Sequence, residues 1–219
     1  MDAILEQMVA SPALPRYVDT LQALLTDERA RRERFYEEMT EQQKVEFING
    51  EVFMHSPVKV RHLDASGNLY FLLKFHVARQ RLGWVANEKA LICLTRNDYE
   101  PDVVFYGSEK AALLKPDQMK LPVPDFVVEV LSPSTERHDR GIKFEDYSAH
   151  GIAEYWIIDP VTRTVEQYAL PAGGTEYATV GVWSGNAEVV SVVVPGFHLP
   201  ALAVFDAEAN LAALSALSA

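Results

Sequence analysis

The chain has 219 residues, of which 48% are hydrophobic and 23% are charged, and its formal net charge is −11 with a pI near 5.0. These values are ordinary for one sizeable globular domain, and the negative charge argues against non-specific coating of nucleic acid, which needs many Lys and Arg residues. No apolar run approaches the roughly 18 residues of a membrane span.

The start of the chain and its single cysteine bear on location. The segment Met1–Gln7 begins with an acid and has no positively charged stretch, so we expect no signal peptide. One cysteine, Cys93, excludes an internal disulfide framework and is typical of the reducing cytoplasm. Cys93 lies in an apolar run, which favours a small buried side chain over a reactive thiol.

The N-terminal third is predicted to be a helix, a hairpin and a second helix. Residues 17 to 43 have a helical composition with alternating charges, which favours a solvated helix, although its arginines are also candidates for nucleic-acid contacts. The segment Val45–Met54 contains Asn49-Gly50, the strongest two-residue hairpin signal. A helix is expected from His62 to Arg81 and closes at Gly83.

The centre of the chain is predicted to be mainly extended. Trp84 to Leu94 reads as a strand pair or a bent strand, Glu100 to Phe105 as another strand, and Gly107 to Pro124 as a long polar loop. The segment Phe126–Leu131 is a short apolar run closed by Ser-Pro, which is typical of a buried strand.

The remainder continues the sheet. A helix is expected from Glu136 to Ala149, capped by Ser134 or Thr135 and ended by Gly151. Strands are expected at 154–160, 164–168, 177–183 and 187–194, followed by an alanine-rich helix near 205–217. The strand–helix–strand order of 125–159 predicts a right-handed crossover and a parallel pair.

Two carboxylates and a lysine are the candidates for chemistry. Glu129 lies inside an apolar strand, where an unpaired charge costs several kcal/mol unless a cation or a shared proton compensates it. Asp102 begins another apolar strand, and Lys143 lies on the helix after Glu129. Two carboxylates on adjacent strands can share a divalent metal, and a lysine can orient the attacking water, which together suit phosphodiester hydrolysis.

Four segments in order carry a resemblance to a known family. They are Pro101-Asp102, Pro124–Thr135, Asp139–Tyr147 and Gly151–Pro160, with Glu46–Glu51 and His62 upstream. In these segments the chain resembles the Uma-two family of restriction endonucleases, within the PD-(D/E)XK nuclease superfamily, over roughly residues 44 to 206. The resemblance implies an α/β fold of the restriction-endonuclease type, with a central mixed sheet flanked by helices.

The resemblance also implies residue roles. Asp102 is similar to the first metal-binding aspartate of the superfamily, and Glu129 to the acid of its (D/E)XK element, so both would hold Mg²⁺ or Mn²⁺. Leu131 stands where that element has lysine, and Lys143 is the substitute, as in the family. Glu46 is expected to supply a further carboxylate, and His62 an extra base or a phosphate donor.

Structural interpretations remain open beside these roles. Glu129 and Lys143 can form a salt bridge that only joins strand to helix, Asp102 can be a turn residue, and Lys143 can pair with Asp139 four residues away.

We therefore predict three regions and one leading function. The regions are a helical extension (1–43), a nuclease-like domain (44–206) and a C-terminal helix or tail (207–219). The leading function is a metal-dependent DNA endonuclease in the cytoplasm, with a possible homodimer formed through the N-terminal helix or the tail. The alternatives are an inactive nuclease fold that binds nucleic acid or a protein, and a hydrolase of another phosphate ester.

Overall fold

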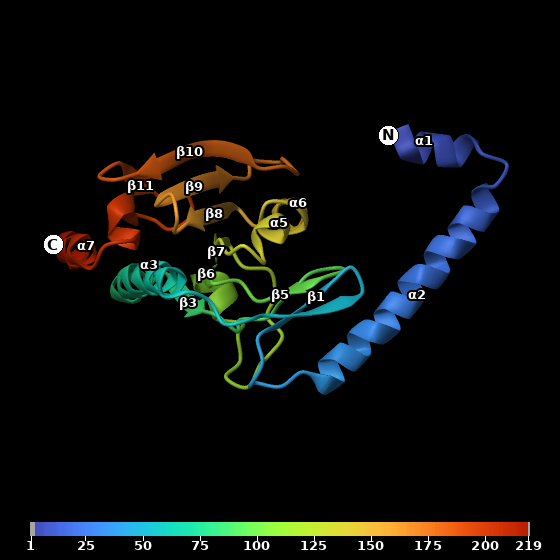
Figure 1. The fold of residues 1–219 in the computed structure, drawn as a ribbon, viewed down its shortest axis with the longest axis horizontal. Helices are drawn as coiled ribbons and strands as arrows, with labels where there is room; N and C mark the ends of the chain where they lie inside the picture. Colours follow the sequence, from blue (N-terminus) through green and yellow to red (C-terminus); the bar gives the residue numbers. More distant parts are fainter. Residues whose placement is uncertain (1–2, 219) are drawn as a thin grey trace.

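The computed structural model describes residues 3–218, so residues 1, 2 and 219 of the predicted extension and tail lie outside the described residues. The chain begins with two helices, α1 (Ala3–Ala10) and α2 (Leu14–Glu38). They form an arm that projects from the body of the molecule (Figure 1). The helix expected over 17–43 corresponds to α2, which starts three residues earlier. It ends at Glu38 because Met39 adopts an extended conformation.

The arm is attached to the body by two ion pairs near the end of α2. Arg32 donates to both carboxylate oxygens of the fully buried Asp98, at 2.5 and 2.7 Å. Glu28 accepts two hydrogen bonds from Arg96, at 2.8 and 2.9 Å. Two hydrogen bonds between one guanidinium and one carboxylate fix the relative orientation of the two groups as well as their distance.

A six-stranded mixed sheet forms the centre of the body, with the strand order β10-β9-β8-β7-β6-β3. Only β7 and β8 run parallel, and every other neighbouring pair is antiparallel, which confirms the predicted parallel pair. The strands are β3 (Gly83–Asn87), β6 (Val103–Gly107), β7 (Phe126–Val130), β8 (Glu154–Asp159), β9 (Thr164–Ala169) and β10 (Ala178–Ser184).

Two smaller sheets complete the strand content of the described residues. The first has the order β2-β1-β5-β4 and contains the predicted hairpin, whose turn residue Asn49 has a φ of 50°. The second pairs β11 with β12. Their strands are β1 (Val45–Ile48), β2 (Glu51–Met54), β4 (Ile92–Cys93), β5 (Asp98–Tyr99), β11 (Glu188–Val190) and β12 (His198–Pro200).

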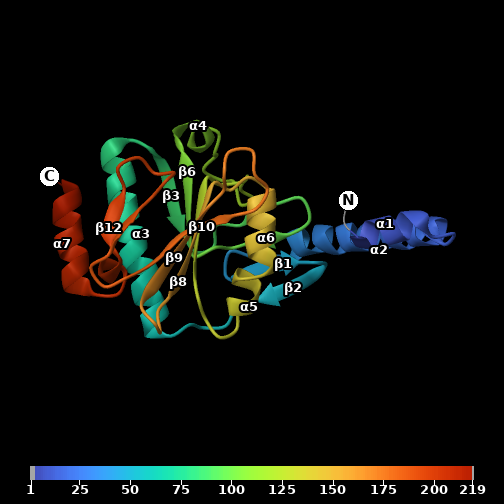
Figure 2. The ribbon, with the colours of Figure 1, turned by 90° about the horizontal axis from the view of Figure 1, so that it is seen from above.

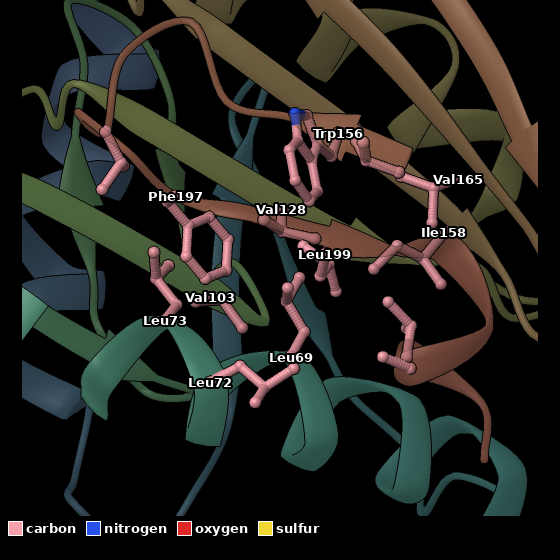
Figure 3. Packing of buried hydrophobic residues seen from close by; sticks show 14 of the residues in the cluster. Leu69, Leu72, Leu73, Val103, Val128, Trp156, Ile158, Val165, Phe197 and Leu199 are labelled. Atoms are coloured by element: carbon pink, nitrogen blue, oxygen red, sulfur yellow. The ribbon is translucent and has the colours of Figure 1, made fainter. Parts of the chain in front are cut away.

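Helices cover both faces of the central sheet. In Figure 2, α3 (Val60–Gln80) and α7 (Ala207–Ser218) lie on one side, while α5 (Glu136–Asp139) and α6 (Ile142–Ala149) lie on the other. The 3₁₀ turn η1 (Ala201–Val204) precedes α7. Figure 3 shows Leu69, Leu72 and Leu73 of α3 packed against sheet residues that include Val128 and Trp156.

The alternation of side chains along β7 positions Glu129. Phe126, Val128 and Val130 belong to the core beneath α3, whereas Val127 belongs to the core beneath α6. Because successive strand residues point to opposite faces, Glu129 shares the face of Val127 and points toward α6.

Four local expectations were wrong. The predicted 136–149 helix is split into α5 and α6 at Gly141, where a Cβ atom would stand 2.8 Å from the carbonyl oxygen of Arg137. No side chain caps α5 at Thr135. The 107–124 segment is not all loop, because it contains a short helix, α4 (Ser108–Ala111). The two strands in the 84–94 segment, β3 and β4, do not pair with each other but belong to different sheets.

The single cysteine has little nucleophilic character. Cys93 is only partly buried, but burial and the nearby Asp98 carboxylate raise the pKa of its thiol to about 12. The thiolate is the reactive form, so the expectation of an unreactive side chain is supported.

Candidate active site

The five residues singled out in the sequence lie in one cluster where the small β1 sheet meets the central sheet. Asp102 precedes β6, Glu129 lies in β7, His62 in α3, Lys143 in α6 and Glu46 in β1. The first four of these residues line a cavity of about 430 Å³ that is open to solvent. Glu46 does not line this cavity, but it contacts two residues that do, Lys143 and His55.

Glu129 is bound on one oxygen and free on the other. Its Oε1 accepts hydrogen bonds from the Lys143 Nζ at 3.0 Å and from the Tyr147 hydroxyl at 2.9 Å. Its Oε2 accepts none from the described residues. Burial raises the pKa of Glu129 to about 8, since Lys143 offsets only part of the effect of burial and of the neighbouring Asp139, Asp102 and Glu46.

Lys143 is the cation that holds the buried part of the cluster together. Its ammonium lies 2.9 Å from Glu46 Oε1, 3.0 Å from Glu129 Oε1 and 3.1 Å from Asp139 Oδ1. Its side chain is only 1% exposed. Burial lowers the pKa of Lys143, but the three carboxylates more than reverse this and keep the amine charged.

Asp102 is anchored from three directions. Its Oδ1 accepts from the Lys44 Nζ at 2.8 Å, and its Oδ2 accepts from the Val130 backbone N–H at 2.8 Å. The His62 Nε2 lies 3.4 Å from Oδ2. Burial disfavours the carboxylate, but His62 and Lys44 outweigh it and hold the pKa of Asp102 well below its usual range. Asp102 is therefore ionised at neutral pH.

Glu46 connects the β1 sheet to α6 and does not line the cavity. Its Oε1 contacts Lys143 and also accepts from the Glu100 backbone N–H at 3.0 Å. Its Oε2 lies 3.2 Å from the His55 Nε2. Burial opposes ionisation, but Lys143 and His55 lower the pKa of Glu46 to about 2. The geometry of Glu46 therefore suits the positioning of Lys143 and His55 rather than the binding of a metal ion.

The structural alternatives considered from the sequence also exist in this site. The Glu129–Lys143 salt bridge and the Asp139–Lys143 pair are both present. These contacts alone do not separate a catalytic from a structural Lys143.

Lys44 is the partner of Asp102 that sequence reasoning missed. Its side chain is 19% exposed, compared with 1% for Lys143, so Lys44 is the more accessible of these two cavity lysines. The signal was the spacing of Lys44 and Glu46, because residues two apart on a strand share a face. The Lys44 carbonyl accepts a hydrogen bond from the His55 N–H, which extends the hairpin to this residue.

The donor set at the cavity fits a magnesium-type ion. Within residues 3–218, no three His, Cys, Asp or Glu side chains form a ready-made ligand group. Mg²⁺, however, is commonly held by one or two carboxylates, with water and substrate phosphate completing its shell. Asp102 and Glu129 supply two carboxyl groups, and among the described residues the Oε2 of Glu129 has no cation partner.

The helices of the described segment were also compared with the requirements of a membrane span. None of them is both long and apolar enough to cross a bilayer.

Comparison with known proteins finds relatives of this chain in sequence and in fold. A sequence model of the Uma2 (Uma-two) family, described as "putative restriction endonuclease", matches residues 32–204. The uncharacterized protein sll1609 of Synechocystis sp. is 29% identical over 149 residues, which cover 67% of this chain and 83% of that protein.

A solved structure shows the same fold. It is titled as a putative nuclease belonging to DUF820 from Anabaena variabilis, and it matches with a TM-score of 0.67 and 18% identity. The match covers 79% of this chain and 96% of that chain. The predicted α/β nuclease fold is thereby confirmed.

Proposed function

The chain belongs to the Uma2 family, and on that premise we propose that it is a Mg²⁺- or Mn²⁺-dependent endonuclease that hydrolyses DNA phosphodiester bonds. The observation that carries the proposal is the meeting of Asp102 and Glu129, from neighbouring strands, at the wall of one open cavity that Lys44, Lys143 and His62 also line. Such a constellation is the minimal set for metal-dependent phosphodiester hydrolysis.

Asp102 and Glu129 would hold the metal. When bound, the ion would supply Lewis-acid activation of water and neutralisation of the phosphate. Asp102 is held ready as a carboxylate by Lys44 and His62, and the Val130 N–H fixes the position of its Oδ2. Glu129 lines the cavity and is positioned by Lys143 and Tyr147, which both bind Oε1, while Oε2 has no hydrogen-bond partner among the described residues.

The two lysines have different parts in this proposal. Lys143 is enclosed by three carboxylates, so it positions Glu129 and stabilises the charge of the cluster. Lys44 has a single carboxylate partner and is more exposed, so it suits contact with a phosphate oxygen. His62 lies on the same cavity wall and is the candidate for a proton carrier.

The proposal is tested by cleavage of supercoiled plasmid DNA in Mg²⁺ or Mn²⁺. We expect the wild type to cleave, and Asp102→Asn and Glu129→Gln to be inactive with unchanged circular dichroism. Glu145→Gln, on the exposed face of α6, is the matched control and should cleave normally. Unchanged cleavage by Glu129→Gln would refute the assignment of this cluster as the active site.

A second candidate is an inactive nuclease fold that binds nucleic acid or a protein. It is favoured by the burial of Lys143 and by Leu131 at the position of the usual lysine. Calorimetric titration of Mn²⁺ into the wild type and the Asp102→Asn/Glu129→Gln double variant separates the two candidates. Heat with the wild type alone supports the endonuclease, and heat with neither protein supports the inactive fold.

We also propose that two copies pair through the α1–α2 arm. Eight large apolar side chains of the arm are at least 40% exposed. Over residues 3–25 the only charged residues are Glu6, Arg16 and Asp19, so this part carries −1 while the chain carries −11. Two copies therefore meet there with little repulsion. Sedimentation equilibrium should give a dimer, and a monomer for Leu21→Glu/Leu25→Glu.

A further inference from the structure

A second and larger cavity lies beside the candidate active site. Its volume is about 740 Å³, within the range of small-ligand pockets. Its floor is formed by the buried side chains of Val45, Leu91 and Leu121. Its walls include Trp84 from β3 and Met119 from the segment after α4.

The two cavities share a wall at Glu88 and Lys89, which line both. These residues have φ angles of 48° and 41°, a left-handed conformation that non-glycine residues adopt at a cost. The conformation is held by hydrogen bonds: the Glu88 N–H donates to the Asp102 carbonyl at 3.0 Å, and the Lys89 Nζ donates to the Glu41 carbonyl at 2.6 Å.

Charge restricts what the larger cavity can bind. Its lining contains four acids and two lysines, namely Glu41, Glu88, Glu100 and Asp117 against Lys89 and Lys115. A phosphate or another anion would be repelled by this excess of acids. A neutral group with apolar faces suits the cavity better.

Glu100 supplies a polar group next to the apolar floor. Its Oε2 accepts a hydrogen bond from the Val45 N–H at 2.8 Å, while its Oε1 accepts none from the described residues. The Oε1 atom is thus an acceptor for an N–H group on the edge of a base.

We propose that this cavity binds one unpaired nucleobase of the nucleic-acid strand whose phosphate lies at Asp102 and Glu129. The base is the neutral, planar part of a nucleotide, and stacking on apolar or aromatic side chains accepts every base. The shared wall at Glu88 and Lys89 places the base cavity next to the phosphate site. The inference rests on the proposed function and names its substrate as single-stranded, or as a duplex with an extruded base.

Binding of two fluorescein-labelled 12-nucleotide strands tests the proposal without hydrolysis, in EDTA. One strand has a mixed sequence, and the other carries abasic residues on the same phosphate backbone. We expect the wild type to bind the base-bearing strand about tenfold more tightly, the factor typical of one stacked base. Fluorescence anisotropy gives both dissociation constants.

Neighbouring residues of the α4 segment provide a matched pair of variants. Ala111 lines the cavity, whereas Ala112 is exposed and does not. Ala111→Trp should fill the cavity and abolish the preference for the base-bearing strand while leaving abasic binding unchanged. Ala112→Trp should retain the preference. Met119→Trp, at an exposed cavity residue, repeats the test if Ala111→Trp does not fold.

Each result decides the question. Equal binding of the two strands by the wild type, no binding of either strand, or the same loss in the Ala111 and Ala112 variants overturns the inference. Cleavage in Mg²⁺ is measured separately. A wild type that prefers the base-bearing strand but does not cleave keeps the base site and refutes the endonuclease.

Discussion

Replacing Lys143 by methionine tests the central electrostatic argument. The ammonium lies within 3.1 Å of three carboxylates, and its side chain is 1% exposed. Methionine has a similar length, so the substitution removes the charge with little change in packing. It leaves Glu46, Glu129 and Asp139 buried together without their common cation.

Breaking a buried ion pair by removing one partner costs about 3–5 kcal/mol. For a chain of this size, each kcal/mol lowers the melting temperature by about 2–4 °C, so we expect a decrease of roughly 6–20 °C. The loss should shrink as the pH falls from 7 to 4, because Glu46, no longer held ionised by Lys143, can then take up a proton. Urea unfolding followed by circular dichroism at several pH values measures both effects.

Lys110 provides the control for this experiment. It pairs with Asp125 at 2.7 Å, but its side chain is 39% exposed. Exposed pairs contribute about 0–1 kcal/mol, so Lys110→Met should have a small effect. If Lys143→Met melts within 2 °C of the wild type, or if its deficit grows on acidification, the cluster does not depend on this charge and our reasoning fails.

Three further predictions follow from contacts in the structure. Lys44→Gln should lower the slope of log affinity against log salt for DNA by about 1, because one phosphate contact is lost; an unchanged slope would place Lys44 off the substrate. Arg32→Ala should cost about 3 kcal/mol by stranding the buried Asp98, whereas Arg31→Ala, in an exposed pair, should cost under about 1 kcal/mol in urea unfolding. Because the pKa of Glu46 falls to about 2 in the folded state, its contribution to stability is present above its ordinary pKa of 4.5 and is lost as the pH falls toward 2. Glu46→Gln should therefore flatten that part of the stability profile in an acid titration.

The sequence predicted the placement of Glu129 but not all of its surroundings. An apolar run on both sides of Glu129 was enough to mark it as a buried charge, and the crossover rule gave the parallel pair of β7 and β8. The interruption at Gly141 was missed because the 136–149 segment keeps a helical composition on both sides of a local close approach. Amino-acid composition indicates the average helix propensity of a segment, and a single close backbone contact can override that propensity.

The candidate site was also predicted only in part, because some of its contacts form between segments that are distant in the sequence. Asp102, Glu129 and Lys143 were found from residue type, order and resemblance, and the structure brings them together with Glu46 and His62. Lys44 was overlooked because its partner Asp102 lies 58 residues away in the sequence. Contacts between sheets depend on tertiary packing, which no local pattern reports.

The order of these residues along the chain has a consequence for synthesis on the ribosome. Glu46 and Lys143, which contact each other at 2.9 Å, are 143 − 46 = 97 residues apart. The cluster therefore cannot form until α6 has left the exit tunnel and docked against the already translated hairpin. If the chain is a nuclease, each nascent molecule therefore remains inactive until α6 has been translated and has docked.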